Sequence, residues 1–255
     1  MSALSVVYTK AGFVLAADGK ASSTDGSISA LTTDYARKIF KARYKRIEFA
    51  WAITEIIYNP DKSFDLLSEV TDAIGALVSV KFKPIGDCVR DVAARTNASI
   101  RKAHADGVIN EYPYNPDSPD KDTIAHVFLA GYFRRLSPSL IRVRFHHKDQ
   151  ILADPQILTE EPPANDIYSG SHAIAQRYCT GLPEDRFGKY FRPSGPLIEH
   201  GIAHAVGFIE ACKDPMASHF DPNCRNIGGR IHAASVTPRD GFRWVPGYEP
   251  SSPET

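Results

Sequence analysis

The residues at the front of the chain could together activate a hydroxyl group as a nucleophile. Ser2 follows Met1, and removal of Met1, which is usual before a residue as small as serine, would leave Ser2 with a hydroxyl and a free α-amine. The reference pKa of an α-amine is about 8, so a modest decrease leaves much of it neutral and able to accept the hydroxyl proton. The sequence therefore predicts a serine nucleophile that carries its own base.

Asp18 and Lys38 supply the charges that such a site needs. A protonated Lys38 near the α-amine would lower the pKa of the amine, and Asp18 would keep Lys38 charged and oriented. Each residue also has an ordinary explanation, since Asp18 precedes a glycine as in many turns and a lone strand lysine is usually solvated. Only the combination of Ser2, Asp18 and Lys38 predicts a site.

Hydrophobic alternation predicts the strands that would bring these residues together. The stretch from Ser2 to Asp18 alternates around a turn at Lys10-Ala11-Gly12, which is typical of a hairpin with Asp18 at the end of its second strand. A polar stretch, A-S-S-T-D-G-S-I-S-A, is predicted to be a loop. A second hairpin is predicted from A-R-K-I-F-K and R-I-E-F-A-W-A-I-T, with Lys38 on its first strand.

The rest of the chain predicts two helices, three strands, two more helices and two final strands. The helices are expected after Pro60, after Pro84, from the introducing Ser169-Gly170-Ser171 to about Tyr178, and from about Leu197 to Lys213. This order favours an α+β fold, a four-layer αββα sandwich of two facing, mainly antiparallel sheets. We expect one domain over residues 1–245 and a flexible C-terminal tail over 246–255.

Three motifs, together with the element order, carry a resemblance to a known family. The motifs G-F-V-L-A-A-D-G-K, A-R-K-I-F and H-V-F-L-A-G-Y…S-L-I-R-V…I-Y-S-G-S-H-A resemble the proteasome β-type subunits, which are N-terminal nucleophile (Ntn) hydrolases. The D-G after the apolar strand looks most like the bacterial peptidase branch. The resemblance extends from Ser2 to about Trp244 and implies that Ser2, Asp18 and Lys38 correspond to the nucleophile, aspartate and lysine of that family.

The resemblance extends to two further residues and also shows departures. It implies that Ser169 corresponds to the serine of a G-S-G-S helix start, although an ordinary helix cap explains that serine equally well. The family glycine whose backbone N–H helps to bind the oxyanion falls near Thr54, and a backbone N–H around Ala52 to Thr54 is the expected donor. The family element D-x-x-S-G-G reads C-R-N-I-G-G here, so its aspartate and serine are missing.

Composition narrows the classes of function. The chain has 255 residues and 43% hydrophobic residues, and its 30 basic and 30 acidic side chains cancel, which argues against a nucleic-acid or anionic-membrane binder. No apolar stretch is long enough to cross a membrane and no secretory signal is evident, so we expect a cytoplasmic protein. The four cysteines form no C-x-x-C pair. His200 and His204 could face one metal ion, but no third ligand is evident, so we expect a surface or capping pair, no metal and no cofactor.

Two hypotheses of different classes follow. The first is a proteasome-like peptide or amide hydrolase that uses Ser2 after removal of Met1, with a peptide or amide as its substrate. The second is a non-catalytic proteasome-like subunit with a role in assembly. The resemblance implies a homo-oligomer, with a ring as one arrangement, and leaves open whether an ATP-dependent partner delivers substrates.

Overall fold

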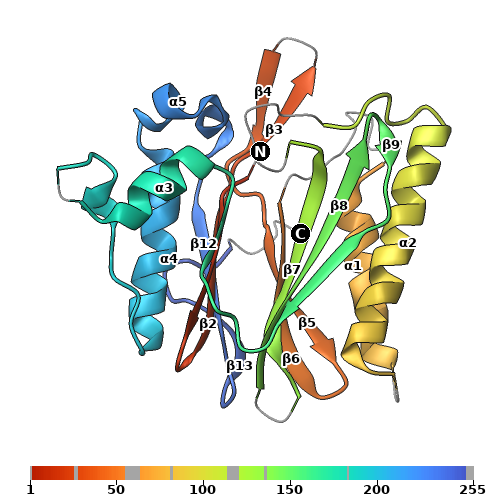
Figure 1. The fold of residues 1–255 in the computed structure, drawn as a ribbon, viewed down its shortest axis with the longest axis horizontal. Helices are drawn as coiled ribbons and strands as arrows, with labels where there is room; N and C mark the ends of the chain where they lie inside the picture. Colours follow the sequence, from red (N-terminus) through yellow and green to blue (C-terminus); the bar gives the residue numbers. More distant parts are fainter. Residues whose placement is uncertain are drawn as a thin grey trace. The chain divides into compact units, whose positions relative to one another are not determined.

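The computed structural model describes residues 2–25, 28–54, 64–80, 83–113, 121–134, 137–182 and 184–250. The chain divides into two compact units (Figure 1). The first unit comprises Met1–Phe40 and Pro163–Thr255, and the second comprises Lys41–Pro162.

A five-stranded antiparallel sheet forms the centre of the first unit. Its strand order is β11-β1-β2-β12-β13. The strands are β1 (Leu4–Thr9), β2 (Gly12–Asp18), β11 (Ile167–Ser169), β12 (Ile231–Thr237) and β13 (Gly241–Trp244). The sheet therefore joins both ends of the chain, with β2 at its middle.

The N-terminal hairpin predicted from the sequence is confirmed. Strands β1 and β2 pair in antiparallel register from Leu4 opposite Ala17 to Thr9 opposite Gly12. The hydroxyl of Thr9 accepts hydrogen bonds from the N–H groups of Ala11 and Gly12, which stabilises the turn. Every residue of β2 is buried, so the hairpin is a core element whose second strand ends at Asp18.

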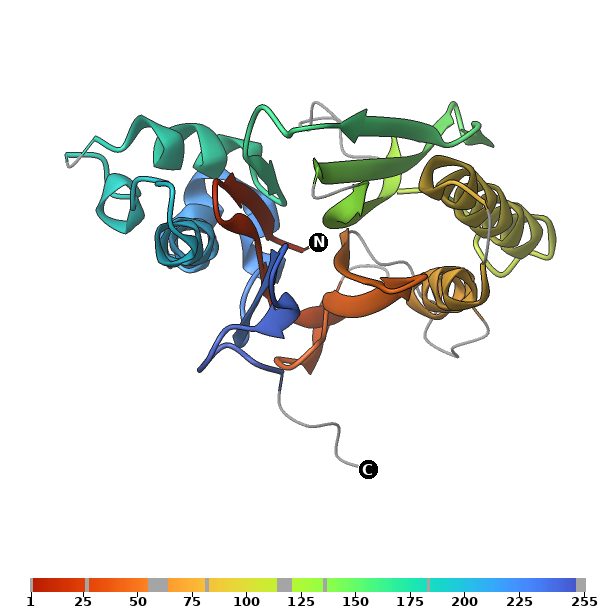
Figure 2. The ribbon, with the colours of Figure 1, turned by 90° about the horizontal axis from the view of Figure 1, so that it is seen from below.

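Helix α4 (Ile198–Lys213) lies along one face of this sheet, and α3 (His172–Thr180) packs beside it (Figure 2). Alternate residues of β1 and β2, among them Val7, Val14 and Ala16, form one apolar cluster with residues of α4 such as Phe208. Burial of this apolar surface is the main force that holds the strands in place. The short helices of the unit are η2 (Gly188–Tyr190), α5 (Ala217–Phe220) and η3 (Pro222–Asn226).

The segment predicted to be a polar loop instead forms most of a second hairpin. Strands β3 (Ala21–Asp25) and β4 (Ile28–Thr33) pair antiparallel as a separate two-stranded sheet. Strand pairing uses backbone groups, so small polar side chains, which lack the usual strand signal, do not prevent it. The prediction was wrong because it considered only core packing.

The second unit contains a six-stranded sheet of order β10-β8-β7-β6-β5, with β9 also paired to β8, and only the first two residues of β5 belong to the first unit. The strands are β5 (Ile39–Tyr44), β6 (Ile47–Thr54), β7 (Thr123–Arg134), β8 (Ser137–Lys148), β9 (Ile151–Leu152) and β10 (Gln156–Glu160). The hairpin predicted from A-R-K-I-F-K and R-I-E-F-A-W-A-I-T is thus confirmed as β5 and β6. Lys38 lies just before β5 rather than within it.

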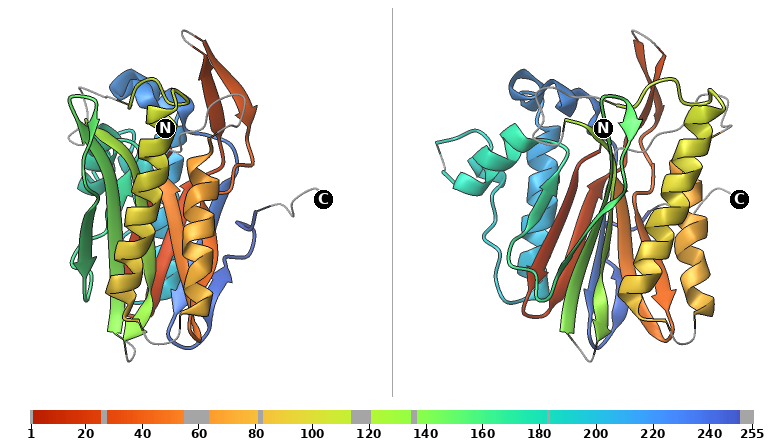
Figure 3. Two further views of the ribbon diagram at one scale, coloured as in Figure 1. Left: turned by 90° about the vertical axis from the view of Figure 1, so that its right-hand side faces the viewer. Right: turned by 45° about the vertical axis from the view of Figure 1, so that its right-hand side comes forward.

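Two helices lie side by side on one face of this sheet (Figure 3). Helix α1 (Leu66–Gly75) continues into η1 (Ala76–Ser79), and α2 (Ile85–Ala105) follows Pro84 at its N-cap. Both helices were predicted from their apolar periodicity, and each buries one side, for example Val70 and Ile74 in α1.

These elements make an α+β protein with two main, chiefly antiparallel sheets among the described residues. None of the helices in the described ranges combines the length and the apolar character needed to cross a bilayer.

Candidate functional site

The Asp18 carboxylate is fully buried at the end of β2 and accepts four hydrogen bonds. Its Oδ1 atom accepts from Lys38 Nζ at 2.6 Å and from the backbone N–H of Ala3 at 2.8 Å. Its Oδ2 atom accepts from the N–H groups of Gly228 at 3.1 Å and Lys20 at 3.3 Å. The many donors compensate for the loss of water around the charge, and they connect the front of the chain to Lys38.

The Lys38 ammonium group is buried beside Asp18, with 1% of the residue exposed. Besides Asp18, its Nζ atom donates to the carbonyl of Lys20 at 2.8 Å. Burial lowers the pKa of Lys38, and the attraction of Asp18 opposes this decrease. An ammonium has three N–H donors, and the hydrogen bonds found within the described ranges use two of them.

A glycine loop from the far end of the chain closes over Asp18. The carbonyl of Gly228 accepts from the N–H groups of Gly19 and Lys20, while its own N–H binds the carboxylate. Gly229 has a φ of +67°, and a Cβ atom there would lie 2.4 Å from the carbonyl oxygen of Asp34. Only glycine avoids both the strained φ and this clash, so glycine is needed at position 229 for the loop to bring the Gly228 N–H to Asp18.

Ser2 lies at the entrance to β1, one residue from the N–H that binds Asp18, and is buried. A Cβ atom at Gly170 would lie 2.5 Å from the Ser2 carbonyl oxygen, so glycine allows the two segments to pass closely. Ser169 pairs with Leu4 in the same sheet. The first unit thus brings the neighbourhoods of Ser2, Asp18, Lys38 and Ser169 together, whereas Met1 lies outside the described residues.

The helix predicted after Ser169-Gly170-Ser171 is confirmed as α3, but Ser169 does not open it. Residues Ile167–Ser169 form β11, Gly170 has a φ of +109°, and Ser171 is the N-cap of α3. The Ser171 hydroxyl accepts from the N–H of Ile174 at 3.2 Å and donates to Asp221 Oδ2 at 2.7 Å. The capping role therefore belongs to Ser171. Residues Ile167–Ser169 form a strand because they pair with β1.

The sequence analysis missed His232, whose side chain is fully buried on β12. No hydrogen-bond partner for either ring nitrogen is found among the residues that the structure describes. Burial lowers the pKa of His232, and the neighbouring cations Arg230, Lys38 and Arg37 lower it further. The only signal in the sequence was a histidine inside the apolar strand R-I-H-A-A-S-V.

We expect His232 to make the protein less stable in mild acid. Its pKa in the folded state lies below the value of about 6.5 for the unfolded chain, so the unfolded chain binds more protons as the pH falls through that value. The free energy of unfolding then decreases, by up to about 1.4 kcal/mol per pH unit for one proton. Urea unfolding at about pH 7.5 and about pH 5.5 should show a smaller difference for His232→Leu than for the unaltered protein; equal differences would contradict this role.

Thr54 ends β6 in the second unit, where it is buried. Its hydroxyl has no hydrogen-bond partner within the described part of the chain. The role of its backbone N–H as an oxyanion donor stays a prediction.

His204 is buried in α4, which contradicts the expectation that His200 and His204 form a surface or capping pair. Its ring contacts the hydroxyl of Tyr168 and the carbonyl of Arg192, and Asp166 Oδ2 lies 3.5 Å from its Nε2. The apolar stripe of α4 carries His204 inward, where these partners satisfy it. The described residues contain no group of three or more histidine, cysteine, aspartate or glutamate side chains that could hold a metal ion.

Comparison with models of known protein families finds no match to this sequence, and comparison with curated proteins finds none either.

Proposed function

We propose that the protein is a proteasome-like hydrolase of peptide or amide bonds, with Ser2 as the nucleophile and its α-amine as the base. The hydroxyl proton of Ser2 moves to the amine while Oγ attacks the carbonyl carbon of the substrate. The ammonium then gives its proton to the departing nitrogen, which leaves an ester on Ser2. Water, activated by the same amine, hydrolyses this ester and regenerates the enzyme.

One observation carries the proposal: a buried aspartate oxygen binds both the Lys38 ammonium and the N–H of the residue that follows Ser2. A rigid cation held near an α-amine lowers the pKa of the amine, which makes it a better base near neutral pH. A solvated surface pair would not provide this, since water and salt would screen it.

The proposal includes the finer predictions of the resemblance. These are a four-layer αββα sandwich of the Ntn type, with one sheet and its helices from each unit, a backbone oxyanion donor at Thr54, and assembly into a homo-oligomer such as a ring. Ser169 is proposed as a residue at the edge of the site, because it pairs with the strand that Ser2 precedes.

The mass of the intact protein tests the first requirement of this mechanism. Because an amine within a peptide bond cannot act as a base, we expect the purified protein to lack Met1 and to begin at Ser2. Mass spectrometry of the undigested chain measures this directly. A preparation in which every molecule retains Met1 would exclude the mechanism.

A specific observation favours the second candidate, a non-catalytic subunit with a role in assembly. Asp18 also binds the N–H groups of Lys20 and Gly228, so its contacts could serve only to hold the hairpin and the glycine loop together. The missing aspartate and serine of D-x-x-S-G-G point the same way. A protein that lacks Met1, forms an oligomer in light scattering and hydrolyses no peptide would favour this candidate.

A further inference from the structure

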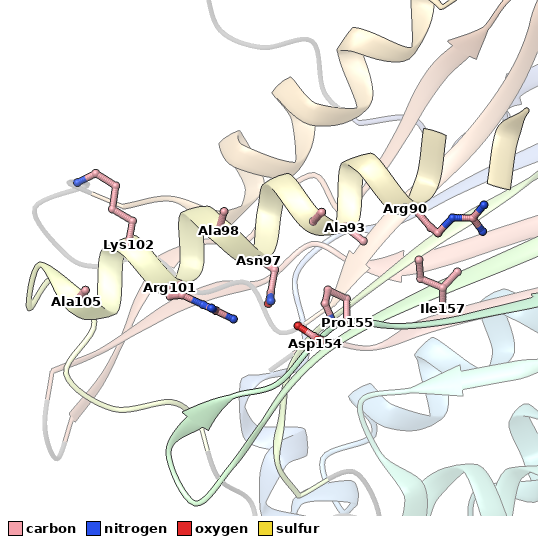
Figure 4. Close-up of a pocket in the computed structure, with 11 residues that line it drawn as sticks. Arg90, Ala93, Asn97, Ala98, Arg101, Lys102, Ala105, Asp154, Pro155 and Ile157 are labelled. Atoms are coloured by element: carbon pink, nitrogen blue, oxygen red, sulfur yellow. The ribbon is translucent and has the colours of Figure 1, made fainter. Parts of the chain in front are cut away.

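A groove in the second unit lies between α2 and the segment 154–157. It has a volume of about 720 Å³ and is open to solvent along its length. One side is a face of α2, and the other is formed by Asp154, Pro155 and Ile157 (Figure 4). The groove lies wholly within one unit and contains none of the residues proposed for hydrolysis.

The face of α2 that lines the groove has small side chains between cationic ones. Alanines such as Ala94 and Ala98 leave room at the middle, while Arg90 and Arg101 lie towards its ends. Arg90 forms a salt bridge with Asp87 on the same helix. Arg101 is in no salt bridge within the described ranges, and its side chain extends towards the segment of Asp154 (Figure 4). The groove therefore offers alanines around Asn97 in its middle, and a guanidinium group that forms no salt bridge within the described residues although the Asp154 carboxylate lies on the opposite wall.

Strand β10 forms the edge of the sheet beside this groove. Alternate residues of an edge strand direct their N–H and C=O groups away from the sheet, where another strand can bind them. Ile157 and Leu158 on this strand are 37% and 45% exposed. Edge strands of monomeric proteins are commonly protected by charged residues, proline or a bulge, and in Q-I-L-T-E the one such residue is Glu160 at its end.

We propose that the edge of β10 and the groove together bind an extended, acidic segment of a partner protein. The segment adds a strand next to β10, as in other cases of peptide recognition by a sheet edge. Every second side chain of the added strand then points towards α2, where apolar side chains fit between the alanines and carboxylates bind the arginines. This proposal does not depend on the proposed hydrolase activity.

The spacing of the two arginines sets the pattern of the segment. Arg90 and Arg101 are separated by about 16 Å along the helix axis, which an extended chain covers in about five residues. Side chains on one face of a strand are an even number of residues apart. Two acidic residues four or six positions apart therefore reach both arginines, with apolar residues on the same face between them.

A second copy of this chain fits the same surface less well. A two-fold axis through β10 would place Leu158 opposite Leu158, but it would also bring the arginine-lined groove of one copy towards that of the other. Like charges in an interface disfavour association. An acidic segment instead neutralises Arg101, so charge complementarity favours a partner protein.

A fluorescent peptide tests the proposal directly. The probe is Glu-Thr-Val-Thr-Val-Thr-Glu, which carries glutamate and valine on one face, and its control has lysine in place of glutamate. Fluorescence anisotropy should show binding of the acidic peptide at least about tenfold tighter than that of the basic one. This preference should weaken at high salt. Hydrogen exchange of the backbone amides of Gln156–Glu160 should become slower in the complex.

Variants on one helix provide the matched control. Arg101→Glu should weaken binding of the acidic peptide at least about tenfold, and the milder Arg101→Ala should weaken it in the same direction. Arg95→Glu changes an exposed arginine of α2 that does not line the groove. This variant should therefore bind the acidic peptide as tightly as the unaltered protein does. Methylation of the peptide backbone nitrogens should also abolish binding, since an added strand needs those N–H groups.

Three outcomes would overturn the proposal. These are equal binding of the acidic and basic peptides, an unchanged affinity in Arg101→Glu, and no binding of the acidic peptide to the unaltered protein at millimolar concentration. A dimer in light scattering that Ile157→Lys converts to a monomer would also overturn it, in favour of a second copy at β10.

Discussion

Replacement of Ser2 by alanine is expected to lower the hydrolysis of a fluorogenic peptide amide at least about a thousandfold. Removal of a nucleophile leaves only the catalysis that binding and polar stabilisation supply. Steady-state rates with a panel of peptidyl coumarin amides measure the effect. Ser2→Thr retains a hydroxyl beside the α-amine and should keep part of the activity.

Ser5→Ala is the matched control for this experiment. Ser5 lies on β1, three residues after Ser2, and is fully buried, with a hydroxyl that has no hydrogen-bond partner within the described residues. Its replacement removes a similar oxygen from the same strand and should leave the rate nearly unchanged. Equal activity of Ser2→Ala and the unaltered protein would eliminate Ser2 as the nucleophile.

Loss of the Asp18 charge should strongly destabilise the protein. Asp18→Asn leaves the Lys38 ammonium buried without its counter-ion, and breaking a buried ion pair from one side costs about 3–5 kcal/mol. Lys38→Met should cost a similar amount for the same reason. The double variant should lose less free energy of unfolding than the two single variants lose together, since neither buried charge then remains. Urea unfolding of the four proteins measures the coupling.

An exposed ion pair of the same length provides the comparison. Lys41 Nζ and Glu48 Oε1 are also 2.6 Å apart, but both side chains reach solvent. Glu48→Gln should therefore cost no more than about 1 kcal/mol. If Asp18→Asn lowers the free energy of unfolding as little as Glu48→Gln does, then burial does not make the Asp18–Lys38 ion pair important for stability.

The sequence predicted the local part of the site well. Alternation from Ser2 to Asp18 and the turn at Lys10-Ala11-Gly12 were enough to predict the hairpin and the place of Asp18 at its end, but not that Asp18 is buried. The pairing of Asp18 with Lys38 was also predicted, because an amine that acts as a base needs a nearby cation and a carboxylate would keep that cation charged and oriented. Periodicity likewise predicted α1, α2 and α4.

The contacts made by distant segments could not be predicted. Strand β11 has only three residues, too few for a periodic signal, and it exists because β1 pairs with it. The hydrogen bond between Ser171 and Asp221 joins residues whose spacing carries no recognisable motif. The polar strands β3 and β4 show that backbone pairing can occur where side-chain patterns indicate a loop.

The glycine loop has a consequence for how the protein matures. Gly228, which completes the shell of donors around Asp18, lies 210 residues further along the chain. During synthesis the N-terminal segment leaves the ribosome long before this loop has been made. Until then the Asp18 carboxylate lacks the hydrogen bond from the Gly228 N–H. A property that depends on the fully liganded Asp18 carboxylate can therefore arise only after the chain has been made as far as Gly228.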